Sequence, residues 1–221
     1  IVSMCLINYF KNKKKNEKSI RFIFISETIG SIAYLKRNLS KLKKNIIGGY
    51  NLTCIGDEKR YSFMLSKNEK SLSDRVLLET FKQLNIKAQK YSFLERGSDE
   101  RQYNSPGIDL PIASIFRSKY KEYKEYHSSL DNFDLVTKKG ILGSFDVCKN
   151  SILNLSKKII PKSNLFCEPN MGKRGLYPLV SNKKKSIQKD LLNFLTYSDG
   201  LNDLHDISAF KISFGFNCIL L

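Results

Sequence analysis

Hydrophobic residues along this chain fall into short, nearly continuous runs and into longer stretches with helical spacing. The run 20–25 contains β-branched and aromatic residues interrupted by a single Arg, a pattern typical of a strand buried on both faces. Similar runs predict strands at 46–55, 91–94 and 110–116. Such strands are typical of a sheet whose two faces are both covered.

Other stretches place apolar residues at the three-to-four spacing of an amphipathic helix. Ser71 and Ser73 are candidate caps for one of these helices. Because helices alternate with strands, the pattern predicts an α/β fold built on a mostly parallel sheet. The predicted helices are 1–10, 28–44, 72–84, 138–155, 187–195 and 203–210.

Two prolines, Pro161 and Pro169, interrupt this alternation. We therefore expect one α/β domain over 1–160 and a small helical unit over 164–221.

The chain is strongly basic, with 38 Lys and Arg against 21 Asp and Glu and a net charge of +17. Such an excess is typical of proteins that bind nucleic acids or anionic membranes. Only 8 of the 38 basic residues are Arg, the residue that reads phosphates and base edges best. We favour a solvated lysine-rich surface, which includes the run 183–185, and binding of nucleic acid remains the alternative.

Five scattered Cys without a C-x-x-C pair argue against a disulfide framework and against a cysteine zinc site. They favour a reducing compartment, so we expect a cytoplasmic protein. No apolar stretch approaches the roughly 20 residues of a membrane span. Since the chain opens on Ile1 in the middle of a helical pattern, we expect it to be a fragment.

Three polar residues follow three of the predicted strands: Glu27, Asp99 and His127. Ligands of open α/β sheets bind at the carboxyl ends of strands, and carboxylates with an imidazole are suitable zinc ligands. Each residue also has a simpler interpretation. Glu27 would interact with a helix dipole, Asp99 would cap a turn, and His127 would be a loop histidine held by Asp131. The other histidine, His205, lies in a predicted helix, where a surface or packing role is expected.

Two long motifs carry a resemblance to a known family. They are the segment 97–107, GSDERQYNSPG, and the segment 125–131, EYHSSLD. Over residues 1 to about 158 the chain resembles a bacterial aminopeptidase-like family, a domain of unknown function whose members are often called polysaccharide biosynthesis proteins. That family is related to the zinc exopeptidases, which implies a three-layer sandwich. The segment 167–178 resembles the junction into the family's winged-helix tail.

The resemblance implies roles for individual residues. Asp99 and His127 match zinc ligands, with Asp131 as a partner of His127, and Glu27 matches the general base. Glu100 stands where the exopeptidases usually have His, and Thr28 stands where they have a carboxylate ligand. The resemblance therefore leaves open whether one or two zinc ions bind and whether Glu27 is itself a ligand. Arg96 and Arg101 are the basic residues near this motif, suited to orient a substrate carboxylate.

The resemblance thus implies a zinc-dependent aminopeptidase acting on a peptide or aminoacyl-type substrate. Two further ligands of such enzymes lie upstream of the helix that opens the chain, so we expect these 221 residues alone to be inactive. The alternative is a non-catalytic accessory or binding protein of polysaccharide biosynthesis with the same fold. The tail beyond residue 207 is too short and too apolar for a complete winged helix.

Overall fold

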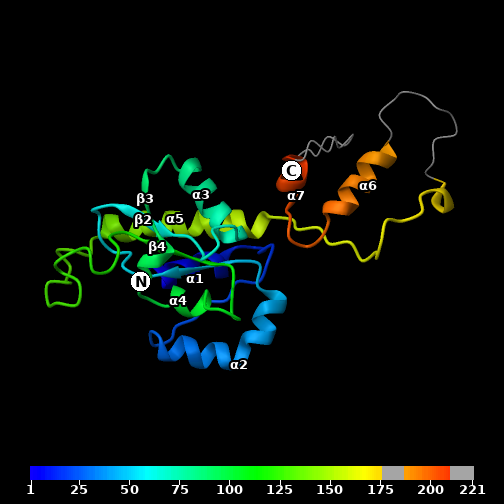
Figure 1. Ribbon diagram of the computed structural model, residues 1–221. Helices are drawn as coiled ribbons and strands as arrows, with labels where there is room; N and C mark the ends of the chain where they lie inside the picture. The colour runs from blue at the N-terminus through cyan, green and yellow to red at the C-terminus, as the bar shows by residue number, and fades with distance from the viewer. Residues whose placement is uncertain (176–186, 210–221) are drawn as a thin grey trace. The chain divides into compact units, whose positions relative to one another are not determined.

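A computed structural model describes residues 1–175 and 187–209 of the chain (Figure 1). The chain divides into two compact units, Ile1–Lys157 and Lys158–Leu221, which are described separately below. The lysine run at 183–185 and the apolar end from 210 to 221 lie outside the described residues, as does the side chain of His205.

The first unit is built on a four-stranded sheet in the order β1-β4-β2-β3. Its strands are β1 (Gly49–Leu52), β2 (Tyr61–Met64), β3 (Ala88–Tyr91) and β4 (Ile112–Phe116). The pairs β1–β4 and β2–β3 are parallel, whereas β2 and β4 run antiparallel. The sheet is therefore mixed and mostly parallel, and the predicted α/β class is confirmed.

Helices α1 (Val2–Asn12), α3 (Leu72–Gln83) and α5 (Lys138–Lys157) cover one face of the sheet. Their apolar residues pack with Ala113 and Ile115 of β4 in the largest buried cluster. Ser71 caps α3, as expected, by accepting a hydrogen bond from the Asp74 amide, while the Asp74 carboxylate accepts one from the Ser71 amide.

The opposite face carries α2 (Ile29–Asn45) and the short α4 (Glu100–Tyr103). Leu35 and Leu42 of α2 pack with Leu110 and Ile112 at the start of β4. Helices on both faces of one sheet form the three layers that were expected.

The predicted strand at 20–25 is wrong, because the segment forms no strand. Ile20 and Phe22 pack partly against the large cluster, but Ile23, Phe24 and Ile25 are 39%, 63% and 37% exposed. A β-prone sequence becomes a strand only when another strand supplies its hydrogen bonds and cross-strand contacts. No described strand pairs with this segment.

The other strand predictions were partly correct. The expected strands 46–55 and 110–116 shorten to β1 and β4, and the strand expected at 91–94 lies earlier, as β3, followed by the 3₁₀ turn η1 (Phe93–Glu95). β2 was not predicted. It has only four residues, and it depends on pairing with β3 and β4 on both sides.

The second unit contains η2 (Gly172–Arg174), α6 (Ile187–Tyr197) and α7 (Leu204–Ala209), so both predicted helices are present. The Asp203 carboxylate accepts a hydrogen bond from the Asp206 amide at 2.9 Å, and the Asp206 carboxylate accepts one from the Asp203 amide at 2.8 Å. This reciprocal pair starts α7. Main-chain hydrogen bonds from Gly200 to Pro161 and from Leu204 to Ile159 tie the turn before α7 to the beginning of the unit.

Over residues 1–175 and 187–209, no helix has the length and hydrophobicity needed to cross a membrane.

Candidate functional site

Asp99 joins the loop before α4 to the beginning of α2. Its Oδ1 atom accepts a hydrogen bond from the Thr28 amide at 2.7 Å and another from the Ser31 hydroxyl at 2.9 Å. Thr28 is the N-cap residue of α2, but its own side chain makes no capping bond. Asp99 therefore binds, from a distant loop, the N-cap amide that the N3 side chain of a capping box usually binds. The negative charge also lies where the positive end of the helix dipole favours it.

Thr28 has an unusual backbone, with φ of 62° and ψ of −67°. Positive φ is strained for a β-branched residue and persists only when its surroundings enforce it. Two contacts hold this residue in place. Asp99 binds its amide, and the Arg101 guanidinium donates a hydrogen bond to its hydroxyl at 2.7 Å.

Glu100, the neighbour of Asp99, is only 1% exposed. Its Oε1 accepts hydrogen bonds from the Gly97 amide at 2.8 Å, the Ser98 amide at 2.9 Å and the Tyr120 hydroxyl at 2.7 Å. The side-chain amide of Asn51 donates a hydrogen bond to Oε2 of Glu100 at 3.2 Å. Burial, followed by the Glu100 carboxylate, raises the pKa of Tyr120 above its usual value. With these partners the Glu100 carboxylate fastens the Asp99 loop to β1 and to the segment after β4.

Glu27 precedes Thr28 and is exposed. Its carboxylate acts on Tyr126, whose pKa is raised first by burial, then by the Cys54 thiol and by Glu27. Glu27 is therefore within electrostatic range of the loop that carries His127.

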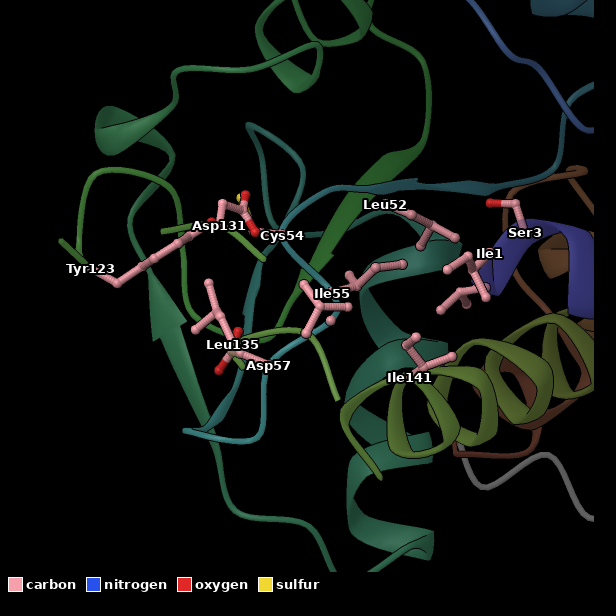
Figure 2. A pocket seen from close by; sticks show the side chains of 13 residues that line it. Ile1, Ser3, Leu52, Cys54, Ile55, Asp57, Tyr123, Asp131, Leu135 and Ile141 are labelled. Carbon is pink, nitrogen blue, oxygen red and sulfur yellow. The ribbon is translucent and has the colours of Figure 1, made fainter. Parts of the chain in front are cut away.

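His127 is exposed and has a φ of 55°. Its ring stacks on Tyr126, with the two centroids 3.9 Å apart and the planes 17° from parallel. The expected pairing with Asp131 is not formed in the part of the chain that the structure describes, where no hydrogen bond joins the two side chains. Asp131 instead lines a cavity with Cys54 and Tyr123 (Figure 2).

This cavity has a volume of about 340 Å³ and lies beyond the end of β1. Its walls combine apolar side chains, among them Leu52, Ile55 and Ile141, with the carboxylates of Asp57 and Asp131. Burial raises the pKa of the Cys54 thiol, so this cysteine is mainly protonated at neutral pH. Glu27, Asp99 and His127 do not line the cavity.

A zinc ion requires at least three protein ligands. Within residues 1–175 and 187–209, no three His, Cys, Asp or Glu side chains lie close enough together to hold a metal ion. Three groups retain the chemistry of a ligand: the exposed Glu27 carboxylate, the exposed His127 imidazole, and Oδ2 of Asp99, which accepts no hydrogen bond from a described residue. The described residues thus do not form a zinc site by themselves.

Sequence reasoning placed Glu27, Asp99 and His127 in one region but missed the residues that support them. Of these supporting residues, Ser31 was the one that the sequence pattern could best have indicated. A small polar residue one turn before Leu35 on the buried face of a helix indicates a partner in another segment. Asn51 and Tyr120 gave no comparable signal.

The chain matches two protein families. Residues 1–158 match a domain of unknown function (DUF4910), and residues 159–220 match a winged helix-turn-helix family.

A protein of Clostridium acetobutylicum, described by inference as a polysaccharide biosynthesis protein with an aminopeptidase-like domain, is 36% identical over 211 residues. The match covers 94% of this chain and 48% of that protein.

Two solved structures are similar to this chain. A crystal structure from Clostridium acetobutylicum, described by inference as a peptidase, has a TM-score of 0.67 and 33% identity, covering 95% of this chain and 48% of that one. An aminopeptidase from Aneurinibacillus sp. has a TM-score of 0.47 and 17% identity over 56% of this chain and 29% of its own. The chain spans about half the length of the relatives it matches. Over residues 1–158, the chain belongs to the family known as the domain of unknown function DUF4910.

Proposed function

We propose that this chain contributes to the active site of a zinc-dependent hydrolase of the aminopeptidase type. Asp99 and His127 are two of the zinc ligands, and the remaining ligands are not among the described residues. Zinc, when bound, supplies Lewis acidity, which lets a water molecule lose a proton near neutral pH. The Glu27 carboxylate would serve as general base toward that water, and the substrate would be a peptide or an aminoacyl compound.

The hydrogen bond between the Thr28 amide and Asp99 is the main support for this proposal. It brings the residue after Glu27 into direct contact with Asp99, although 71 positions separate them along the chain. The effect of Glu27 on the pKa of Tyr126, on which His127 stacks, extends the same region to the third residue.

Zinc content after equilibrium dialysis tests the assignment of ligands. We expect the 221-residue chain to hold less than one zinc ion per molecule, and Asp99→Asn or His127→Gln to remove it. His205→Gln, which changes the other histidine, is the matched control and keeps the zinc. Zinc content that neither ligand variant changes would overturn the proposal.

Hydrolysis of aminoacyl reporter substrates tests the chemistry. We expect no turnover by the 221 residues alone, and zinc-dependent turnover by the full-length Clostridium acetobutylicum relative, of which this chain covers 48%. Turnover by the chain alone would show that it holds a complete site. An inactive full-length relative would refute the hydrolase.

One observation favours a second candidate, a non-catalytic binding protein. The Asp99 carboxylate accepts hydrogen bonds from a backbone amide and a hydroxyl. Thr28 stands where the exopeptidases have a carboxylate ligand, and its hydroxyl accepts a hydrogen bond from the cationic Arg101. A full-length relative that holds stoichiometric zinc without cleaving the reporters would support this candidate over the hydrolase.

A further inference from the structure

The two arginines of the Asp99 loop have different surroundings. The Arg96 guanidinium donates to the Phe93 carbonyl at 3.4 Å and lies over the Phe93 ring, 5.3 Å from its centroid. The Arg101 guanidinium instead points to the beginning of α2, where it donates to the Thr28 hydroxyl at 2.7 Å. Only Arg101 is connected to the candidate site.

Arg101 also has unused binding capacity. A guanidinium carries five N–H donors, and the one hydrogen bond of the Arg101 side chain is to a neutral hydroxyl. The residue is exposed and forms no ion pair with any described acidic residue. Its charge is therefore available to a ligand.

Asp99, although close, does not neutralise this charge. Its Oδ1 atom is occupied by the Thr28 amide and the Ser31 hydroxyl, and Arg101 reaches only the Thr28 side chain. Thr28 in turn is fixed by Asp99, so it holds the guanidinium at a defined position beside the site. A planar guanidinium held in this way is suited to bind a carboxylate through two parallel hydrogen bonds.

We propose that Arg101 determines substrate specificity by binding a free carboxylate of a short peptide ligand. This inference rests on the proposed function for the peptide nature of the ligand. It selects Arg101 over Arg96, and it assigns Thr28 a positioning role: its hydroxyl orients the guanidinium and does not touch the substrate.

Binding of two matched dipeptides to the intact chain tests the proposal. The probes are alanyl-leucine and alanyl-leucinamide, which differ in the free carboxylate, and NMR titration measures both dissociation constants. We expect the carboxylate form to bind about three- to five-fold more tightly, as is typical of an exposed charge pair. The preference falls as salt is added.

Three variants locate the source of that preference. Arg101→Gln abolishes it, Thr28→Val reduces it, and the control Arg96→Gln leaves it unchanged. Arg101→Lys keeps the positive charge but lacks the planar guanidinium, so we expect it to retain only part of the carboxylate preference. This variant separates loss of recognition from loss of folding. Equal affinity for the two dipeptides, binding of neither, or a preference that survives Arg101→Gln would overturn the proposal.

Zinc content separates this inference from the proposed function. A dipeptide preference in a chain whose zinc content is insensitive to Asp99→Asn and His127→Gln would refute only the zinc ligands. Zinc bound through those residues without any carboxylate preference would refute only the role of Arg101.

Discussion

The Thr28 amide donates a hydrogen bond of 2.7 Å to Oδ1 of Asp99, so that a loop carboxylate caps a helix that begins far away in the sequence. Sequence reasoning gave Asp99 two interpretations, a zinc ligand and a turn cap. The structure shows a capping role, but for the helix that follows Glu27. Since only one carboxylate oxygen is used, this role is compatible with the proposed zinc ligand.

Removal of the Asp99 carboxylate should destabilise the protein. Asp99→Ala leaves the Thr28 amide without its acceptor and leaves the Ser31 hydroxyl with only its second acceptor, the Thr28 carbonyl. We expect a loss of about 1–2 kcal/mol in the free energy of unfolding. Asp99→Asn keeps an oxygen acceptor and should lose less. Urea unfolding measures both, with the exposed Asp134→Ala as control. An Asp99→Ala protein as stable as the control would contradict the capping role.

The buried Glu100 should be more sensitive than Asp99. Glu100→Ala removes the acceptor of four hydrogen bonds from a buried position, and we expect a loss of about 2–4 kcal/mol. Tyr120→Phe removes one of these bonds and should cost about 1 kcal/mol. A double-mutant cycle should show that the two losses are not additive, because the residues share one hydrogen bond. Additive losses would argue against that contact.

Stability should fall at high pH partly because of Tyr103. Burial, together with the negative charge of Asp99, raises the pKa of Tyr103 from 10 to about 12. The folded protein thus holds this proton more tightly than the unfolded chain. The resulting stabilisation is complete below pH 10 and is lost as the pH rises toward 12. Denaturation curves of Tyr103→Phe should show a shallower decline over this range, and identical pH profiles for the two proteins would refute the assignment.

Gly140 should tolerate no side chain. A Cβ atom there would lie 2.0 Å from the Gly56 carbonyl oxygen and 2.6 Å from that of Asp57, both of them backbone atoms. Gly→Ala normally stabilises a helix by about 1 kcal/mol, but here we expect Gly140→Ala to destabilise by about 3 kcal/mol. Thermal unfolding measures the sign, and Lys138→Ala is the exposed control in the same helix. A stabilised Gly140→Ala protein would show that α5 and the Gly56 loop are not in close contact.

Helices were predicted well and strands less well, for a physical reason. The periodicity of α3 and α5 is a property of neighbouring residues, and so is the Ser71 cap that starts α3. The segment 20–25 has a strong β pattern but forms no strand, whereas the short β2 forms one between two partners. Strand formation depends on residues elsewhere in the chain, which a local pattern does not contain.

By itself, the sequence determined the α/β class and most of the helices. Only the tertiary structure decided that Asp99 binds the Thr28 amide, that Glu100 is a buried support, and that Arg101 rather than Arg96 is connected to this region. Helical periodicity is encoded within a few residues. The contacts of a candidate site depend on how segments distant in sequence pack together, and residue spacing does not specify those distances.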